Sequence, residues 1–188
     1  MIQFPTLFRT TFTSLLFLAI IIFLPLVSCC QDDPPQYKST GISPLVQVGF
    51  SQGLSGTEKG KTGLAAQAVF SYLFNANFSA GLGATLESFD KTTYTPIFAD
   101  VRVYLKDKKF TQCALINLGY SRATVSRQPD LSGILLRAGI GVKYHLSYNF
   151  SLIGDIAYQI QQLDEKNPAP NTPATETHAL TVKVGLSF

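Results

Sequence analysis

The chain has 188 residues, of which 46% are hydrophobic and 14% are charged, and its net charge is +3. This length suits a single domain, and so small a net charge excludes a nucleic-acid partner. The three cysteines are Cys29, Cys30 and Cys113. They are too few for a disulfide framework and too scattered for a thiolate metal site, so we expect no metal and no cofactor.

The amino-terminal residues 1–29 have the layout of a secretory signal peptide. Arg9 is the single charge in this segment, and an apolar run from Leu15 to Val27 is followed by small residues. The run is shorter than the roughly 20 apolar residues that a spanning helix needs, which favours a cleaved signal over a kinked membrane anchor.

Two interpretations of the end of this segment stay open. Leu26-Val-Ser-Cys29 resembles the lipobox of bacterial lipoproteins, in which the cysteine becomes the acylated first residue of the mature chain. Ordinary signal-peptidase cleavage after small residues fits the same stretch. Residues 30–43, which are polar and contain Pro34 and Pro35, are expected to form a periplasmic leader or linker.

From residue 44 onwards, apolar and polar residues alternate in eight segments. A period of two gives a β-strand with one apolar and one polar face, and each segment reaches the roughly 9–11 residues of a tilted membrane-spanning strand. The predicted strands are 44–53, 63–74, 77–88, 95–106, 110–123, 132–145, 149–162 and 178–188. Short and longer connections alternate between them, which predicts an all-β fold: an eight-stranded antiparallel up-and-down transmembrane β-barrel over 44–188, with both termini in the periplasm.

The last strand carries the clearest signal for a membrane. Its apolar residues Leu180, Val182, Val184, Leu186 and Phe188 alternate with polar or small ones. A soluble barrel of the lipocalin type would turn its apolar face inward and its charges outward. Here the charges share the face of the glycines and serines, so we expect the apolar face to contact lipid.

Aromatic residues are expected in two girdles where the barrel crosses the membrane interfaces. The predicted periplasmic girdle is Phe74, Phe78, Phe110, Tyr144, Phe150 and Phe188, and the predicted outer girdle is Phe50, Phe89, Tyr120 and Tyr158.

These strands, their turns and the terminal alternation resemble the small outer-membrane β-barrel family of Gram-negative bacteria, the proteins similar to OmpX and the membrane domain of OmpA. The resemblance covers about 44–188. It implies a place in the cell outer membrane with its lipids as partners, and assembly by the barrel-assembly machinery, which reads the last strand and Phe188. The family contains adhesins, lipid-modifying enzymes and scaffolds, so the fold does not identify a surface ligand.

The inward face holds the candidate site residues. The interior of an eight-stranded barrel is just wide enough for its own side chains, and charges buried there are expected to pair. The charged residues of this predicted polar network are Glu87, Asp100, Arg102, Arg137, Lys143, Asp155 and Lys183, and its amides are Gln47, Gln67, Asn117, Gln159 and Gln161. Selective conduction through a narrow pore is the alternative.

One short motif suggests an enzyme. His145-Leu-Ser147 resembles the His-x-Ser element of outer-membrane lipid A deacylases. The inward acid that follows, Asp155, does not match that family's spacing, and the motif falls at a periplasmic turn. We therefore expect a non-enzymatic surface protein whose loops serve adhesion, partner contact or envelope integrity, with a lipid-modifying enzyme or a narrow pore as alternatives.

Overall fold

The computed structural model describes residues 37–90, 92–105, 109–125, 131–165 and 175–188. In these residues no helix is long and apolar enough to cross a membrane. The elements in chain order are β1 (Gly41–Gly53), the 3-10 helix η2 (Gly56–Glu58), β2 (Thr62–Asn75), β3 (Phe78–Ser88), β4 (Thr92–Tyr104), β5 (Phe110–Val125), β6 (Leu131–His145), β7 (Ser151–Glu165) and β8 (Thr175–Ser187).

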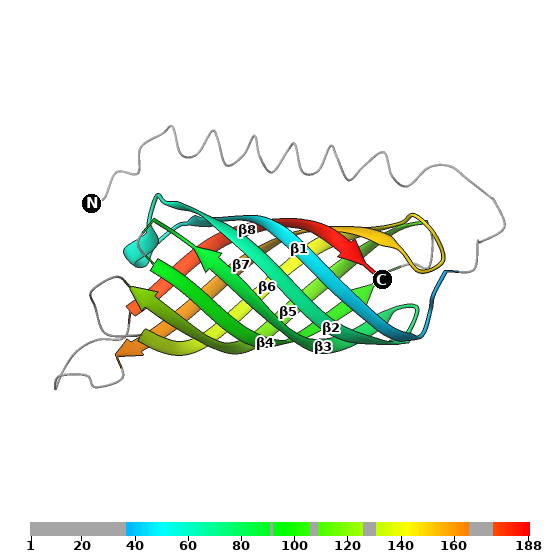
Figure 1. Ribbon diagram of the computed structural model, residues 1–188, viewed down its shortest axis with the longest axis horizontal. Coiled ribbons are helices and arrows are strands. Elements are labelled where there is room, and N and C mark those ends of the chain that lie inside the picture. Colours follow the sequence, from blue (N-terminus) through cyan, green and yellow to red (C-terminus); the bar gives the residue numbers. More distant parts are fainter. Residues whose placement is uncertain (1–36, 91, 106–108, 126–130, 166–174) are drawn as a thin grey trace, which may run out of the picture. The chain divides into compact units, whose positions relative to one another are not determined.

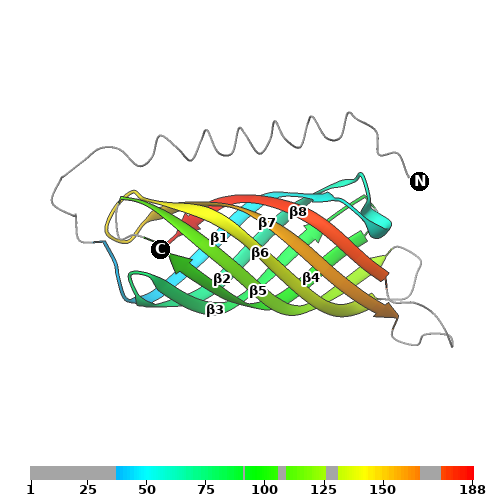
Figure 2. The ribbon, with the colours of Figure 1, turned by 180° about the vertical axis from the view of Figure 1, so that it is seen from behind.

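Each strand pairs antiparallel with the next one along the chain, and β8 pairs back with β1 to close the barrel (Figures 1 and 2). The predicted eight-stranded up-and-down barrel is confirmed. Strand ends differ from the predicted ones by at most three residues. β1 begins at Gly41, inside the predicted leader, because Ile42 and Ser43 already pair with Tyr72 and Ser71 of β2.

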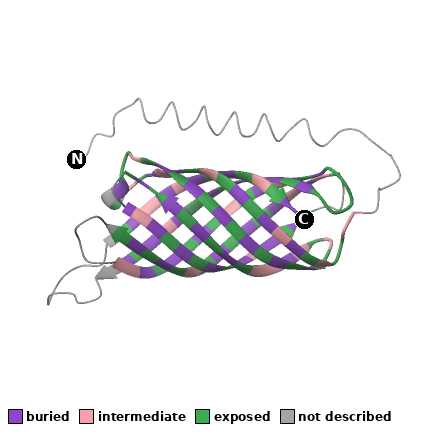
Figure 3. Ribbon diagram, in the orientation of Figure 1, coloured by how far each residue is buried: buried purple, intermediate pink, exposed green. Residues whose placement is uncertain are grey.

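Buried and exposed residues alternate along every strand, as Figure 3 shows. In β8, Val182 and Val184 are 47% and 50% exposed, whereas Thr181 and Lys183 between them are at most 1% exposed. The outward face is apolar in the middle of all eight strands, and exposed charges such as Arg122 and Glu176 lie towards the strand ends. Such an apolar belt would promote aggregation in water but suits a hydrocarbon environment. The predicted assignment of the two faces is confirmed.

The barrel has two different ends. β1 begins and β8 finishes at one of them, here called the termini end, and the opposite end, here called the loop end, carries η2 (Figure 1). The predicted alternation of short and longer connections makes the one between β3 and β4, over residues 89–93, one of the longer ones, and this was wrong. It is a tight hairpin in which the backbone N–H of Phe89 donates to the carbonyl of Thr92 (2.9 Å).

One predicted girdle residue faces the wrong way for that role. Phe89 is only 5% exposed and packs edge-on against Tyr94, with ring centres 5.7 Å apart. It follows β3 in phase with the inward Glu87, so the alternation of the strand continues into the turn. The other predicted outer aromatics, Phe50, Tyr120 and Tyr158, are exposed on the outward face.

The seam between β1 and β8 leaves no room for side chains at two glycines. A Cβ on Gly185 would lie 1.9 Å from the carbonyl oxygen of Val46, and one on Gly49 would lie 2.0 Å from that of Val182. A side chain at either position would push the two strands apart, so close approach of the backbones requires glycine here.

Candidate functional site

Polar side chains from every strand meet inside the barrel, because inward positions alternate with the lipid-facing ones. We call the following ten residues the lumen network. Its members, each at most 4% exposed, are Gln47 (β1), Gln67 (β2), Glu87 (β3), Asp100 and Arg102 (β4), Asn117 (β5), Arg137 (β6), Asp155 and Gln159 (β7) and Lys183 (β8).

Arg102 joins two of the three carboxylates in this network. Its Nε lies 3.1 Å from Asp100 Oδ2, and its Nη1 lies 3.4 Å from Asp155 Oδ2. Gln47 reinforces the second contact, because its amide donates to the same Asp155 oxygen (2.7 Å) while its carbonyl accepts from Arg102 (3.4 Å). The guanidinium is therefore held on two sides by carboxylate oxygens in a buried environment.

Gln67 binds the other two cations of the network, Arg137 and Lys183. Its carbonyl oxygen accepts hydrogen bonds from Arg137 Nη2 (2.6 Å) and Lys183 Nζ (2.9 Å). Lys183 also lies 3.6 Å from Glu87 Oε1, and Gln159 donates to the other Glu87 oxygen (2.9 Å).

Asn117 connects the two halves of the network. Its amide donates to Asp100, and its carbonyl oxygen accepts from Arg137 Nε (2.7 Å). Hydrogen bonds therefore run without a break from Asp155 on one side of the lumen to Arg137 on the other.

Charge is balanced within the lumen network, since three carboxylates accompany three cations. The seventh predicted residue, Lys143, is also buried, but it lies nearer the termini end with its Nζ 5.1 Å from the centre of the Tyr104 ring. Burial of an ion is costly unless hydrogen bonds and an opposite charge compensate it. Every ion of the network makes a hydrogen bond, and carboxylates pair with Arg102 and Lys183, whereas Arg137 is bound by the neutral Asn117 and Gln67. One oxygen each of Glu87 and Asp155 accepts no hydrogen bond among the described residues. The arrangement is that of a packed polar core in which part of the buried charge is directly paired.

An apolar cluster crosses the lumen beside the network, and this was not predicted. Its members come from five strands and are Leu45, Val69, Phe98, Leu135 and Ile153, all at most 3% exposed. Phe98 also places its ring 5.2 Å from the guanidinium carbon of Arg137. These side chains fill space that an aqueous path would need.

At the termini end, His145 is buried and faces the lumen. Its Nδ1 lies 2.9 Å from Ser151 Oγ, and the ring of Tyr37 stacks on it with centres 4.2 Å apart. Ser147 instead accepts a hydrogen bond from the backbone N–H of Phe150 (3.3 Å) in the exposed turn. His145 and Ser147 therefore have separate partners, which is not the arrangement of a catalytic pair.

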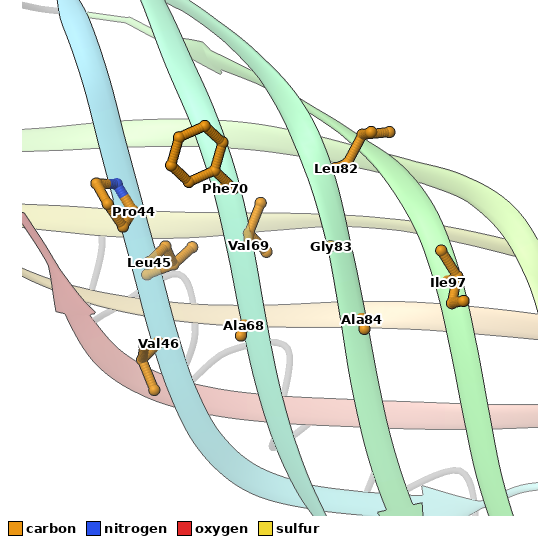
Figure 4. Close-up of a pocket in the computed structure, with 10 residues that line it drawn as sticks. All are labelled: Pro44, Leu45, Val46, Ala68, Val69, Phe70, Leu82, Gly83, Ala84 and Ile97. Carbon is orange, nitrogen blue, oxygen red and sulfur yellow. The ribbon is translucent and has the colours of Figure 1, made fainter.

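The lipid-facing wall has a shallow depression of about 450 Å³ across β1 to β4 (Figure 4). Ala68 and Ala84 pair directly in its floor, and the longer side chains of Phe70 and Leu82 pair beside them. All of its lining residues are apolar, so it can accommodate hydrocarbon but offers no group for acid–base or nucleophilic chemistry. Within the described residues, no group of three His, Cys, Asp or Glu side chains is arranged to hold a metal.

Two predicted site residues remain, Phe188 and Cys29. Phe188 lies at the termini end, where its ring packs edge-on against Phe150 at 5.2 Å and its backbone N–H donates to the carbonyl of Pro44. Cys29 and the predicted signal peptide lie outside the described residues. Glu58 is a buried acid in the connection between β1 and β2. It could not be singled out from the sequence, because it lies between two strands and outside their alternating pattern.

A closed eight-stranded barrel with an apolar outer face and a packed polar lumen is the architecture of the small outer-membrane β-barrel proteins. No protein-family model matches the chain, and no curated protein matches its sequence.

Solved structures do match. The crystal structure of Neisserial surface protein A aligns with a TM-score of 0.67 and 14% identity, over 80% of this chain and 97% of that one. The N-terminal β-barrel domain of Pseudomonas aeruginosa OprF aligns with a TM-score of 0.54 and 13% identity, over 80% of this chain and all of that one. At such identities the similarity concerns the fold. Together with the apolar outer face, that fold assigns the protein to the Gram-negative outer membrane.

Proposed function

We propose that the protein is a non-enzymatic outer-membrane scaffold that presents its loop end at the cell surface for adhesion, partner contact or envelope integrity. The observation that carries this proposal is the lumen network. Side chains from all eight strands join across the interior, and an apolar cluster packs beside them. A barrel filled in this way supports its loops rigidly but provides no aqueous path.

The orientation of the barrel follows from its connections. Barrels of this class have short periplasmic turns and longer outer loops. The segments between β1 and β2 and between β7 and β8 are the two longest connections, and both belong to the loop end. The loop end therefore faces the outside in this proposal. Neisserial surface protein A is by its name a surface protein, which agrees with such a role.

Two parts of the proposal concern how the protein reaches the membrane. Residues 1–29 contain the signal peptide, which a leader follows. If the lipobox is used, cleavage occurs before Cys29, and Cys29 is then the lipidation site. Phe188 and the strand before it are recognised by the barrel-assembly machinery. Mass spectrometry of the amino-terminal peptide distinguishes the two cleavages, because an acylated Cys29 carries the mass of its lipid chains.

The experiment for the surface role compares three strains: the wild type, a deletion, and a strain whose barrel carries short Gly-Ser turns in place of residues 54–61 and 166–174. If the loops bind a partner, the short-turn strain loses attachment to surfaces as completely as the deletion. If the barrel serves envelope integrity, the short-turn strain keeps the detergent resistance that the deletion loses. A change in lipid A mass in the deletion strain would instead favour a lipid-modifying enzyme and contradict the proposal.

A further inference from the structure

The connection between β1 and β2, residues 54–61 and here called loop 1, is folded into the loop end of the barrel. A Cβ on Gly53 would lie 1.9 Å from the carbonyl oxygen of Glu58, so the backbone of η2 lies directly against β1. A Cβ on Gly56 would lie 2.5 Å from the carbonyl oxygen of Glu176, so η2 also touches β8. Figure 1 shows this short helix at the end of the barrel opposite the carboxyl terminus.

Backbone hydrogen bonds attach only the base of loop 1 to the barrel wall. The N–H groups of Leu54 and Ser55 donate to the carbonyl of His178 on β8, at 2.8 and 3.4 Å. The N–H of Gly53 donates to the carbonyl of Lys61, and the N–H of Gly60 donates to the carbonyl of Gly53, both at 2.9 Å. These two bonds join the two sides of the loop. Gly60 has φ +78, and a Cβ there would meet nothing within 4 Å.

The tip of the loop is held by one carboxylate. Glu58 is 1% exposed, and its two oxygens accept hydrogen bonds from the Tyr94 hydroxyl (3.2 Å) and from Lys61 Nζ (3.1 Å). The Lys61 side chain is 41% exposed, so solvent weakens this ion pair. The Tyr94 hydroxyl is the buried contact of the two, since Tyr94 is 2% exposed.

Tyr94 belongs to a second apolar cluster inside the loop end, which also contains Phe89, Ala123 and Leu163. The carboxylate of Glu58 is therefore buried next to apolar side chains. A buried carboxylate costs free energy unless its hydrogen bonds compensate the loss of water. Glu58 thus stabilises the docked loop only while both of its hydrogen bonds are made.

Two buried hydroxyl groups, one in the loop and one beneath it, lower the stability of the docked state. Ser55 Oγ and Thr177 Oγ1 are buried and have no hydrogen-bond partner among the described residues. Thr177 Oγ1 lies directly under η2, 2.9 Å from where a Cβ on Gly56 would be. Each such group loses its hydrogen bonds to water on docking and regains them when the loop opens.

We propose that loop 1 is a lid on the mouth of the barrel at its loop end, held closed by the hydrogen bond of Glu58 to Tyr94, and that it opens locally while the barrel stays closed. The strands are joined by continuous ladders, whereas the lid is held by a few bonds and one buried carboxylate, so the lid is the region of lower local stability. Opening places Glu58 in water and exposes the cluster of Phe89, Tyr94, Ala123 and Leu163. This inference requires the barrel alone and holds for any surface partner.

Amide hydrogen exchange of the purified full-length protein in lipid nanodiscs tests the proposal. In the wild type, the amides of Leu54, Ser55 and Lys61 should exchange faster than those of the paired residues of β1 and β2. Tyr94→Phe removes one hydrogen bond to a charged acceptor and should accelerate exchange in loop 1 about tenfold, with no change in the strands. Thr177→Val removes an unpartnered hydroxyl and should slow it several-fold.

Lys59→Ala is the matched control, because Lys59 is exposed in the same loop and its removal should leave exchange unchanged. Slower migration of boiled samples on a gel verifies that each variant forms the barrel. If Tyr94→Phe does not form the barrel, Glu58→Ala removes the same hydrogen bond from the loop side and should also accelerate exchange in loop 1. Exchange in loop 1 that occurs only together with the strands, or that neither Tyr94→Phe nor Glu58→Ala accelerates by more than twofold, would overturn the lid.

Discussion

At the scale of single residues, the lumen network depends on contacts that compensate buried charge in pairs. Arg102 faces Asp100 and Asp155, and Asn117 ties Asp100 to Arg137. Such a network adds little net stability when complete, because desolvation offsets much of the attraction. Loss of one member is costly, because the remaining charges stay buried without a partner.

We therefore expect Arg102→Leu to destabilise the folded barrel by about 3–5 kcal/mol. The reason is that Asp100 and Asp155 lose their shared cation in a region that water does not reach. Urea-induced unfolding in lipid vesicles measures the change, with the exposed Lys59→Ala as the control. An unfolding curve for Arg102→Leu that superimposes on the control would contradict the role assigned to the network.

The polar residues of the lumen could be predicted from the sequence because nearly all of them lie between two apolar or small neighbours. The inward apolar residues could not. Leu135 lies between Ile134 and Leu136, and Ile153 follows Leu152, so the alternation disappears locally into an apolar run. Such a run is compatible with either face, and only the packing of five strands around Phe98 places these side chains inside.

At the scale of elements, β8 combines three properties: it closes the barrel on β1, its outward face contacts lipid, and it ends beside Phe188. Val182 lies near the middle of β8 and is 47% exposed on the outward face. Val182→Arg should destabilise the barrel by about 2–4 kcal/mol, since an arginine near mid-membrane contacts hydrocarbon. Folding yield into lipid vesicles measures this, and Val182→Leu should fold as the wild type does. Equal yields for the two variants would mean that this position does not face lipid.

Substitutions of Phe188 can distinguish a defect in assembly from a loss of barrel stability. If the assembly machinery reads the terminal aromatic, Phe188→Ser should lower the amount of protein in the outer membrane several-fold, whereas Phe188→Tyr should preserve it. The edge-on contact with Phe150 contributes only about 1 kcal/mol. Purified Phe188→Ser should therefore still refold in vesicles. A variant that reaches the membrane normally would show that Phe188 is not an assembly signal here.

The order of elements was predictable because a period of two and the turns between strands are local properties of the chain. The environment of the connections was not. Phe89 turns inward, and Glu58 is buried under the Tyr94 hydroxyl, because tertiary contacts at the loop end decide both positions. A sequence pattern carries no information about a loop that folds back into its own barrel.

At the scale of the whole molecule, the closed ladder from β1 to β8 leaves no free strand edge in the membrane. Detergent alone should therefore not unfold the barrel. We expect unboiled samples to migrate faster than boiled ones on a gel containing dodecyl sulfate, and the protein to fractionate with membranes. Identical migration of the two samples, together with recovery in the soluble fraction, would contradict the barrel.

The same closed barrel has packed side chains at both ends and in the middle of its described part. Tyr37 and His145 stack at the termini end, the lumen network and its apolar cluster occupy the middle, and Glu58 of loop 1 is buried at the loop end. Opening of loop 1 would leave the middle of the barrel packed. This packing supports the proposed role as a scaffold over that of a channel.

The most direct test of this account is the electrical conductance of the purified protein in planar lipid bilayers. Protein that shows heat-modifiable migration, and is therefore folded, is added to the membrane under an applied voltage. A lumen packed by the network predicts no single-channel steps above the bare bilayer at any voltage. Reproducible discrete steps from folded protein would show that ions pass the network, and would contradict the central claim.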